Sequence, residues 1–292
     1  MKFRLATWNI NSVRLRIGLV ERFLTRFQPD VLCLQEIKCI DEAFPYDAIR
    51  ALGYAHIHVK GQAGYHGVAT VSRLPIQPKG TENFCGSGQA RHIAVALDGR
   101  PLVVHNVYIP AGGDIPDPEL NPKFNQKLAY LRTLAEWFGD GGAADTTCQH
   151  VLVGDFNVAP LEHDVWSHKQ LLRVVSHTPI EVEHLARLKA SARWVDIMRK
   201  YVPDDQKLYT WWSYRAQDWR ASNRGRRLDH IWTTPGLDDA VRGMIVVDEA
   251  RGWDQPSDHV PVIADFELGE PNAPCFLAHP ARGEDKKQAG HG

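Results

Sequence analysis

The stretch from residue 151 to 160 constrains the fold most, because it joins a buried strand to a polar turn. Three apolar β-formers, 151–153, run into Gly154, and a carboxylate and an amide follow at Asp155 and Asn157. In an extended chain, residues two apart point to the same side, so these two side chains would face one site. Ends of buried strands commonly carry the chemistry of α/β folds. An ordinary Asx turn is the alternative interpretation.

The apolar spacing along the rest of the chain predicts many strands and several helices. Strands are expected at 3–8, 30–36, 56–60, 67–72, 91–97, 101–108, 208–214, 228–232, 243–247 and after 257; helices are expected at 14–27, 123–138 and, with a break near Pro179, over 162–201. This order favours an α/β fold, a four-layer α/β sandwich in which two mixed β-sheets pack face to face and are flanked by helices. We expect one catalytic domain over 1–268 and a flexible tail over 269–292, where apolar residues are few.

The composition of the 292-residue chain is that of an ordinary globular protein, with a net charge of −1 at pH 7. No apolar run approaches the roughly 18 residues that a membrane helix needs, and no signal-peptide core follows the first residues. We therefore expect a cytoplasmic protein with no membrane partner, and a monomer. The five cysteines are scattered, which argues against a disulfide framework and against a cysteine zinc site.

A chain with a net charge of only −1 would bind nucleic acid only through a local basic patch. One such patch is a run of arginines interleaved with Tyr214 and Trp219, namely Arg215, Arg220, Arg224, Arg226 and Arg227. A solvated loop is the alternative interpretation of this run.

Polar side chains follow other predicted strands in the same way as at Asp155. They are Asn9, Asn11, Glu36, Tyr108, Asp229, Asp258 and His259. If these strands end on one side of the sandwich, several carboxylates share a pocket, and their repulsion favours a bound cation. Oxygen ligands select a hard ion such as Mg²⁺ or Mn²⁺, and a histidine beside a carboxylate serves as a positioned acid or base. Together these groups suit metal-assisted hydrolysis of a phosphodiester.

The chain resembles the exonuclease III family of apurinic/apyrimidinic endonucleases, within the endonuclease–exonuclease–phosphatase superfamily. The matching segments occur in family order over residues 1 to about 268, and they are Trp8-Asn9-Ile10-Asn11-Ser12-Val13-Arg14, Leu34-Gln35-Glu36-Ile37-Lys38, Gly67-Val68-Ala69, Asn106-Val107-Tyr108-Ile109-Pro110, Gly154-Asp155-Phe156-Asn157, Arg227-Leu228-Asp229-His230 and Ser257-Asp258-His259. Each segment is weak alone, and their common order makes the resemblance specific.

The resemblance implies a role for each matching residue. Glu36 would be the central ligand of Mg²⁺ or Mn²⁺, with Asn9, Asp155, Asn157, Asp258 and His259 completing the metal site. The catalytic residues would be Tyr108, Asp155, Asn157, Asp229 and His259. Asp155 would orient or deprotonate the attacking water or protonate the leaving oxygen, and His259, oriented by Asp229, would stabilise the pentavalent transition state.

The resemblance also implies DNA contacts from Asn11, Arg91, Trp211, Trp212, Arg224, Leu228 and Trp253. Trp211, Trp212 and Leu228, with Trp253, would form an apolar pocket for a flipped-out abasic sugar, although plain core packing is the alternative for the tryptophans. After Pro110, some relatives carry an amide and a basic residue that engage DNA. This chain has 111–114, Ala-Gly-Gly-Asp, instead, which leaves open how this loop meets the duplex.

The expected function is therefore a metal-dependent DNA repair nuclease that cuts duplex DNA 5′ to abasic sites. 3′→5′ exonuclease activity and cleaning of blocked 3′ ends would be further activities of the same site. A phosphodiesterase or phosphatase acting on lipid or inositol phosphates is the alternative, but it would not need the arginine–tryptophan segment at 211–227. A DNA-binding module without catalysis is a third possibility, which the filled catalytic positions argue against.

Overall fold

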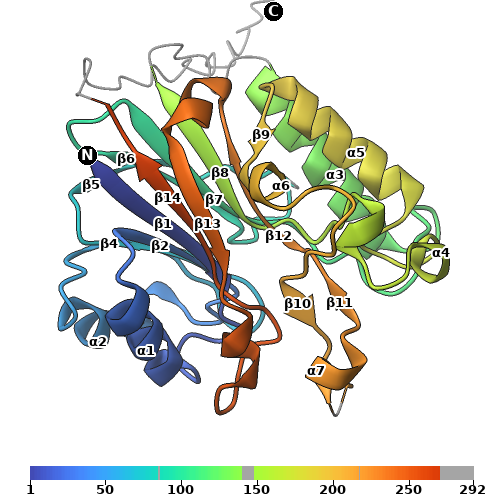
Figure 1. Ribbon diagram of the computed structural model, residues 1–292, viewed down its shortest axis with the longest axis horizontal. Helices are drawn as coiled ribbons and strands as arrows, with labels where there is room; N and C mark the ends of the chain where they lie inside the picture. The colour runs from blue at the N-terminus through green and yellow to red at the C-terminus, as the bar shows by residue number, and fades with distance from the viewer. Residues whose placement is uncertain (85, 140–147, 217, 270–292) are drawn as a thin grey trace, which may run out of the picture.

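Two mixed β-sheets pack face to face in the computed structural model, which describes residues 1–84, 86–139, 148–216 and 218–269 (Figure 1). The first six-stranded sheet has the order β13 (Val241–Val246), β14 (Val262–Glu267), β1 (Lys2–Asn9), β2 (Val31–Gln35), β4 (Val68–Ser72) and β3 (His56–Lys60). The second has the order β5 (Ile76–Gly80), β6 (His92–Leu97), β7 (Leu102–Tyr108), β8 (Gln149–Asp155), β12 (Asp229–Thr233) and β9 (Val195–Asp196). A short ribbon pairs β10 (Trp211–Trp212) with β11 (Gly225–Arg226).

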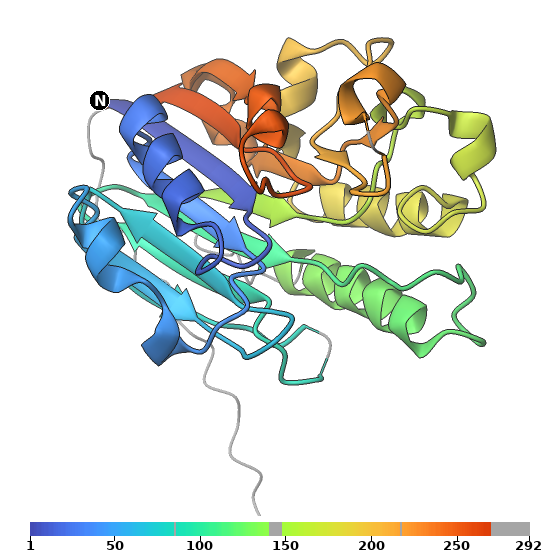
Figure 2. The ribbon, with the colours of Figure 1, turned by 90° about the horizontal axis from the view of Figure 1, so that it is seen from below.

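Helices pack on both outer faces of this sheet pair. The helices of the described residues are α1 (Ile17–Phe27), α2 (Tyr46–Arg50), α3 (Pro122–Trp137), α4 (His168–Leu171), α5 (Pro179–Ser191), α6 (Ile197–Tyr201) and α7 (Trp219–Ser222), the last of which lies at the end of the β10–β11 ribbon (Figure 1). Figure 2 shows α1 and α2 on the side of the first sheet, away from α3. In Figure 1, α3 and α5 lie side by side over the second sheet. The four-layer α/β sandwich expected from the sequence is confirmed.

Three apolar clusters fill the three interfaces between these layers, and strand alternation assigns residues to them. Leu5 lies in the cluster between the sheets, whereas Trp8 belongs to the cluster beneath α1. In the second sheet, Val151 and Val153 pack between the sheets, and Leu152 packs under α3 and α5. Because successive side chains of a strand point to opposite faces, an unbroken apolar run is what a strand covered on both faces requires.

Local signals set several helix boundaries. The side chain of Asn121 accepts a hydrogen bond from the backbone of Lys123 and caps α3, with Pro122 at the first helical position. Pro179 likewise begins α5, where Thr178 and Glu181 form a capping box. The expected break near Pro179 is therefore the start of a helix.

Some expectations were wrong in detail. Helix α1 begins at Ile17 and not at residue 14, because residues 12–16 form a turn. The strand expected over 208–214 is limited to β10, and β5 was not foreseen, because its Pro78 and Lys79 do not read as a strand interior. Cys148 is disulfide-bonded, which the cysteine spacing did not indicate, while Cys33 and Cys39 are free thiols. Spacing alone does not reveal which cysteines a fold brings together.

Two further expectations concern the limits of the chain and its surroundings. The tail predicted for 269–292 lies, from residue 270 on, outside the described residues and stays a prediction. None of the helices in the described ranges has both the length and the apolar character needed to cross a bilayer.

A row of buried histidines lies on the helix-covered face of the second sheet. Nε2 of His92 and Nδ1 of His105 are 3.3 Å apart, and Nε2 of His105 and Nδ1 of His150 are 3.0 Å apart. These hydrogen bonds can form when the three rings are neutral, since each ring can then donate one hydrogen bond and accept another. Burial lowers the pKa of His92 to about 3 and holds the pKa of His105 well below its ordinary value.

We predict that this row makes the protein less stable in acid. Unfolded histidines take up a proton at a pKa of about 6.5, whereas His92 stays neutral down to a pKa of about 3 in the folded protein. Between these values the unfolded chain binds more protons, so stability is full above the upper value and falls as pH falls, by roughly 1.4 kcal/mol per pH unit for each such histidine. Urea unfolding of the wild type and of His92→Gln at pH 7.5, 6.5 and 5.5 measures the difference. As pH falls, the free energy of unfolding of His92→Gln should decrease less per pH unit than that of the wild type. An equal pH dependence in the two proteins would contradict the prediction. His56→Gln is the matched control.

Candidate active site

The pairing of three neighbouring strands brings the catalytic candidates of the second sheet together. In the parallel pair of β7 and β8, Tyr108 is opposite Asp155, and in the antiparallel pair of β8 and β12, Asp229 is opposite Asp155. Gly154 permits this close packing. Its φ is +138°, and a Cβ there would lie 1.9 Å from the carbonyl oxygen of Val107.

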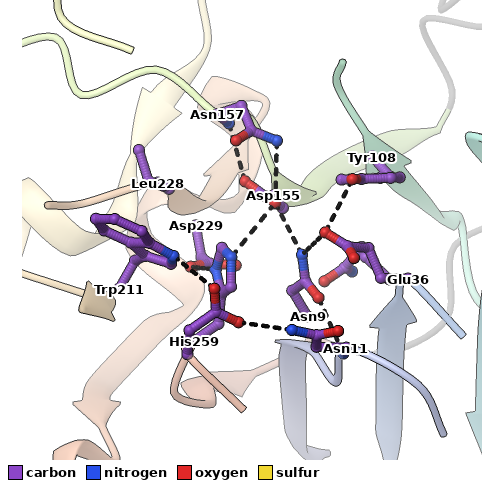
Figure 3. Close-up of polar contacts among 12 residues, drawn as sticks. Asn9, Asn11, Glu36, Tyr108, Asp155, Asn157, Trp211, Leu228, Asp229 and His259 are labelled. Atoms are coloured by element: carbon purple, nitrogen blue, oxygen red, sulfur yellow. Dashed lines mark hydrogen bonds and ion pairs between the residues drawn. The ribbon is translucent and has the colours of Figure 1, made fainter. Parts of the chain in front are cut away.

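The first sheet contributes the other side of the site, at the ends of β1 and β2. Asn9 is opposite Gln35 in this parallel pair, and Glu36 follows directly with a left-handed φ of +48°. Asn9 Nδ2 donates to Asp155 Oδ2 at 2.9 Å and to Glu36 Oε1 at 3.0 Å (Figure 3). The Tyr108 hydroxyl also donates to Glu36 Oε1, at 2.8 Å. One amide thus joins the carboxylates of the two sheets.

Asn157 holds the Asp155 carboxylate from the turn after β8. Its backbone N–H donates to Asp155 Oδ1 at 2.9 Å, and its Nδ2 donates to Asp155 Oδ2 at 3.1 Å. The left-handed φ of +54° at Asn157 turns the chain back on itself, so that backbone and side chain reach the same carboxylate. The two residues act as one polar unit, as their spacing in the sequence suggested.

A buried acid–imidazole–acid arrangement completes the centre. His259 Nδ1 lies 2.8 Å from Asp229 Oδ2, and His259 Nε2 lies 3.7 Å from Asp155 Oδ2. Burial alone would lower the pKa of His259, but the carboxylates of Asp229 and Asp155 outweigh it and raise that pKa to about 10. Burial raises the pKa of Asp155 to about 7, with Asp229 and Glu36 adding to the rise and His259 and Asn9 opposing it. The ring is therefore an imidazolium that can donate a hydrogen bond from Nε2.

Asp258 and its partners form the rim of the site. Asn11 Nδ2 donates to Asp258 Oδ1 at 3.0 Å, and the indole Nε1 of Trp211 donates to Asp258 Oδ2 at 2.9 Å. Lys38 Nζ contacts both Asn11 Oδ1, at 2.7 Å, and Glu36 Oε2, at 2.9 Å. Asn11 and Trp211 thus reach the carboxylate cluster from opposite sides.

A pocket of about 880 Å³ extends from this cluster along the β10–β11 ribbon. Its lining includes the polar group Glu36, Asp155, Asn157, Asp258 and His259. It also includes aromatic, apolar and cationic side chains, among them Trp166, Trp211, Leu228, Arg215, Arg224 and Arg226. One pocket therefore carries both carboxylates and guanidinium groups.

The structure places some of the expected DNA-contacting residues elsewhere. Trp212 and Trp253 are only 5% and 7% exposed, pack in the core cluster beneath α1, and are not part of the pocket lining. Arg91 is buried, its guanidinium lies 4.6 Å from the centre of the Tyr108 ring, and it donates to the Tyr108 carbonyl. Trp211 and Leu228 do line the pocket.

The donor set fits a hard divalent cation. Glu36, Asp155 and Asp258 supply carboxylate oxygens, Asn9 and Asn157 supply amides, and Asp229 lies next to Asp155, while the protonated ring of His259 offers no ligand atom. A buried oxygen of Asp229, Oδ1, has no hydrogen-bond partner among the described residues. Crowded carboxylates with spare acceptor capacity favour a cation with oxygen ligands.

Sequence reasoning missed a buried lysine that supports the Asp155 turn. Lys127 of α3 is fully buried, is ion-paired with Glu181, and donates to the backbone oxygen of Asn157 at 2.7 Å. Glu181 in turn accepts from the backbone N–H groups of Ser176 and Thr178. A lysine inside an amphipathic helix is usually solvated, so the sequence offered no signal apart from its place among apolar residues.

We predict that Lys127→Met destabilises the fold, because it leaves Glu181 buried without a cation. Removing one partner of a buried pair costs about 3–5 kcal/mol, and urea unfolding measures this loss. Lys127→Met combined with Glu181→Gln should regain part of the lost stability, since Gln keeps an acceptor without the charge. The exposed Lys189→Met is the matched control, and a Lys127→Met variant as stable as this control would refute the prediction.

Comparisons with known proteins agree with this geometry. The sequence pattern of the Endonuclease/Exonuclease/phosphatase family matches residues 6–259. The chain is 32% identical to an exodeoxyribonuclease III of Haemophilus influenzae over 279 residues, which are 91% of this chain and 100% of that protein.

Solved structures give the same result. A 3′ phosphatase from Neisseria, bound to a product DNA hairpin, is 31% identical with a TM-score of 0.82. An AP endonuclease from Archaeoglobus fulgidus is 30% identical, also with a TM-score of 0.82, and each alignment covers 91% of this chain and 100% of the other. The chain therefore belongs to the endonuclease/exonuclease/phosphatase family, as a nuclease of the exonuclease III type.

Proposed function

We propose that this nuclease hydrolyses the phosphodiester 5′ to abasic sites in duplex DNA, with Mg²⁺ or Mn²⁺ as its metal. The observation that carries the proposal is the pair of Asp155 and His259, with Asp229 buried behind the histidine, in the wall of a pocket of about 880 Å³ that has room for a flipped-out sugar. Relatives that act on DNA ends and abasic sites support DNA as the substrate. Action on blocked 3′ ends, and 3′→5′ exonuclease activity, belong to the same proposal.

In an in-line displacement at phosphorus, each residue of the site has a separate role. Asp155, held by Asn9 and Asn157, is placed to accept a proton from the attacking water. The new bond joins the water oxygen to phosphorus, and the bond from phosphorus to the 3′-oxygen of the upstream nucleotide breaks. His259, kept protonated by Asp229, donates from Nε2 to a phosphate oxygen whose charge rises in the transition state.

The metal would be held by Glu36, Asp155 and Asp258, with Asn9, Asn157 and His259 beside them. A bound divalent ion supplies charge stabilisation to the phosphate and lowers the pKa of water. Tyr108 contributes by donating to Glu36, which fixes the orientation of that carboxylate.

We predict metal-dependent nicking of a duplex that carries one tetrahydrofuran abasic analogue. Cleavage should occur with Mg²⁺, leave a 3′-hydroxyl 5′ to the analogue, and stop on addition of chelator. Asp155→Asn and His259→Ala should each lower kcat by about 10²–10⁴-fold, the usual contribution of a positioned acid, base or charge-stabilising group. Denaturing gel electrophoresis of end-labelled strands measures the products, and Arg187→Met, an exposed change on α5, is the control.

The same assay separates the alternatives. Progressive shortening of an intact blunt duplex, with no nick at the analogue, would make the protein chiefly an exonuclease. If the folded protein cleaves neither duplex and instead releases phosphate from inositol phosphates, the DNA proposal is wrong.

A further inference from the structure

Arg226 is a largely buried cation without an anionic partner in the wall of the active-site pocket. Its Nη1 donates to the Val175 carbonyl at 3.0 Å and to Ser176 Oγ at 2.8 Å, and its guanidinium lies 5.2 Å from the centre of the Trp211 ring. Its Nε is buried and has no hydrogen-bond partner, and no carboxylate of the described residues forms an ion pair with it. The side chain is thus fixed in place while part of its donor capacity is unused.

The adjacent arginine, Arg227, shows that a buried guanidinium in this protein can be fully ion-paired. Arg227 is fully buried, but it is paired with Asp164 at 2.7 Å and with Asp196 at 2.7 Å, and despite burial these carboxylates raise its pKa. For Arg226, burial lowers the pKa, and distant Glu181 opposes this only in part. A buried cation without a partner costs free energy unless an anion binds it.

A second unpaired guanidinium lines the same pocket. Arg224 is exposed, stacks 4.8 Å from the centre of the Trp166 ring, and makes no hydrogen bond or ion pair within the described part of the chain. Both arginines are therefore backed by indole rings, which hold the planar groups without satisfying their N–H donors. Planar donors of this kind match the oxygens of a phosphate.

The contacts that hold Arg226 indicate which phosphate these arginines bind. Under the proposed function, the scissile phosphate lies beside Asp155 and His259, whereas Arg226 is held against Val175 and Ser176 in the wall of the same pocket. The sugar residue that enters the pocket carries a second phosphate on its 3′ side. We propose that Arg224 and Arg226 bind this 3′-side phosphate and so select residues inside a strand over 3′-terminal residues with a free hydroxyl. The inference rests on the proposed function and extends it to substrate specificity.

Internal hydrogen bonds connect this subsite to the catalytic turn. Ser176 Oγ accepts from Arg226, and the backbone N–H of Ser176 donates to Glu181. Glu181 pairs with Lys127, which donates to the Asn157 carbonyl. The distance between the two phosphate positions is thereby fixed by buried side chains rather than by a mobile loop.

A double-mutant cycle, in which an arginine of the protein and a phosphate of the DNA are changed separately and together, tests the proposal. The substrates are duplexes with an internal tetrahydrofuran residue in which the 3′-side linkage of that residue is either a normal phosphate or a neutral methylphosphonate. A third duplex carries the methylphosphonate one linkage further downstream. Equilibrium binding is measured with chelator present, and kcat/KM with Mg²⁺, for the wild type, Arg226→Met, Arg224→Met and the control Arg220→Met, whose exposed side chain stacks on Trp219.

We expect neutralising the 3′-side linkage to weaken wild-type binding by about tenfold or more, as for a lost charge-assisted contact. Arg226→Met should weaken binding of the normal duplex similarly and show no further loss with the methylphosphonate. Arg220→Met should keep the full methylphosphonate effect. Equal methylphosphonate effects in the wild type and Arg226→Met, or coupling only to the downstream linkage, would overturn the inference.

The two proposals can fail separately. A wild type that nicks the abasic duplex but shows no coupling to Arg226 overturns the subsite and leaves the proposed function intact. A wild type that neither binds nor nicks the abasic duplex overturns both. Arg226→Met should unfold at the same urea concentration as the wild type or a higher one, because it removes a buried cation that has no ion-pair partner, so a loss of binding is not a loss of fold.

Discussion

The contact between Gly154 and the carbonyl of Val107 is the constraint on which the active site depends. It allows β7 and β8 to approach closely just where both strands end, and this places Tyr108 next to Asp155. Any side chain at this glycine would collide with backbone, which cannot move aside as a flexible side chain can. The Asp155 carboxylate therefore takes its position from main-chain packing, and hydrogen bonds from Asn9 and Asn157 refine it.

Some buried charges in this protein have ion-pair partners and others do not. The paired charges stabilise the fold, and the unpaired charges lie in the candidate active site. Arg227 is balanced by Asp164 and Asp196, and this balanced set belongs to the scaffold. Around Asp155 and Arg226 the charges are left partly unbalanced, with crowded carboxylates and a guanidinium without an ion-pair partner in the lining of one pocket. Under the proposed function, a phosphodiester and a divalent metal ion would complement these charges, so the free-energy cost of burying them would be offset on binding.

The sequence predicted the strands and the polar residues at their ends, because apolar alternation and turn chemistry are local properties. The sequence did not show which of two adjacent residues lines the pocket and which is buried in the fold. Trp211 donates to Asp258 in the pocket while Trp212 packs in the core, and Arg226 lines the pocket while Arg227 is ion-paired beneath it. These differences come from which face of the short ribbon meets the body of the fold, and strands distant in sequence determine that.

The first and last strands of the domain are hydrogen-bonded neighbours, and this has a consequence for biosynthesis. β1 pairs with β14 along most of its length, the indole of Trp8 donates to the carbonyl of His259, and Ser257 Oγ donates to the carbonyl of Asn9. Contacts over such a sequence separation form late, since the ribosome must first deliver the distant partner. A nascent chain therefore lacks His259 and the contact of Ser257 with Asn9 until synthesis of the domain is nearly finished, so the first strand to be made is among the last to gain all its partners.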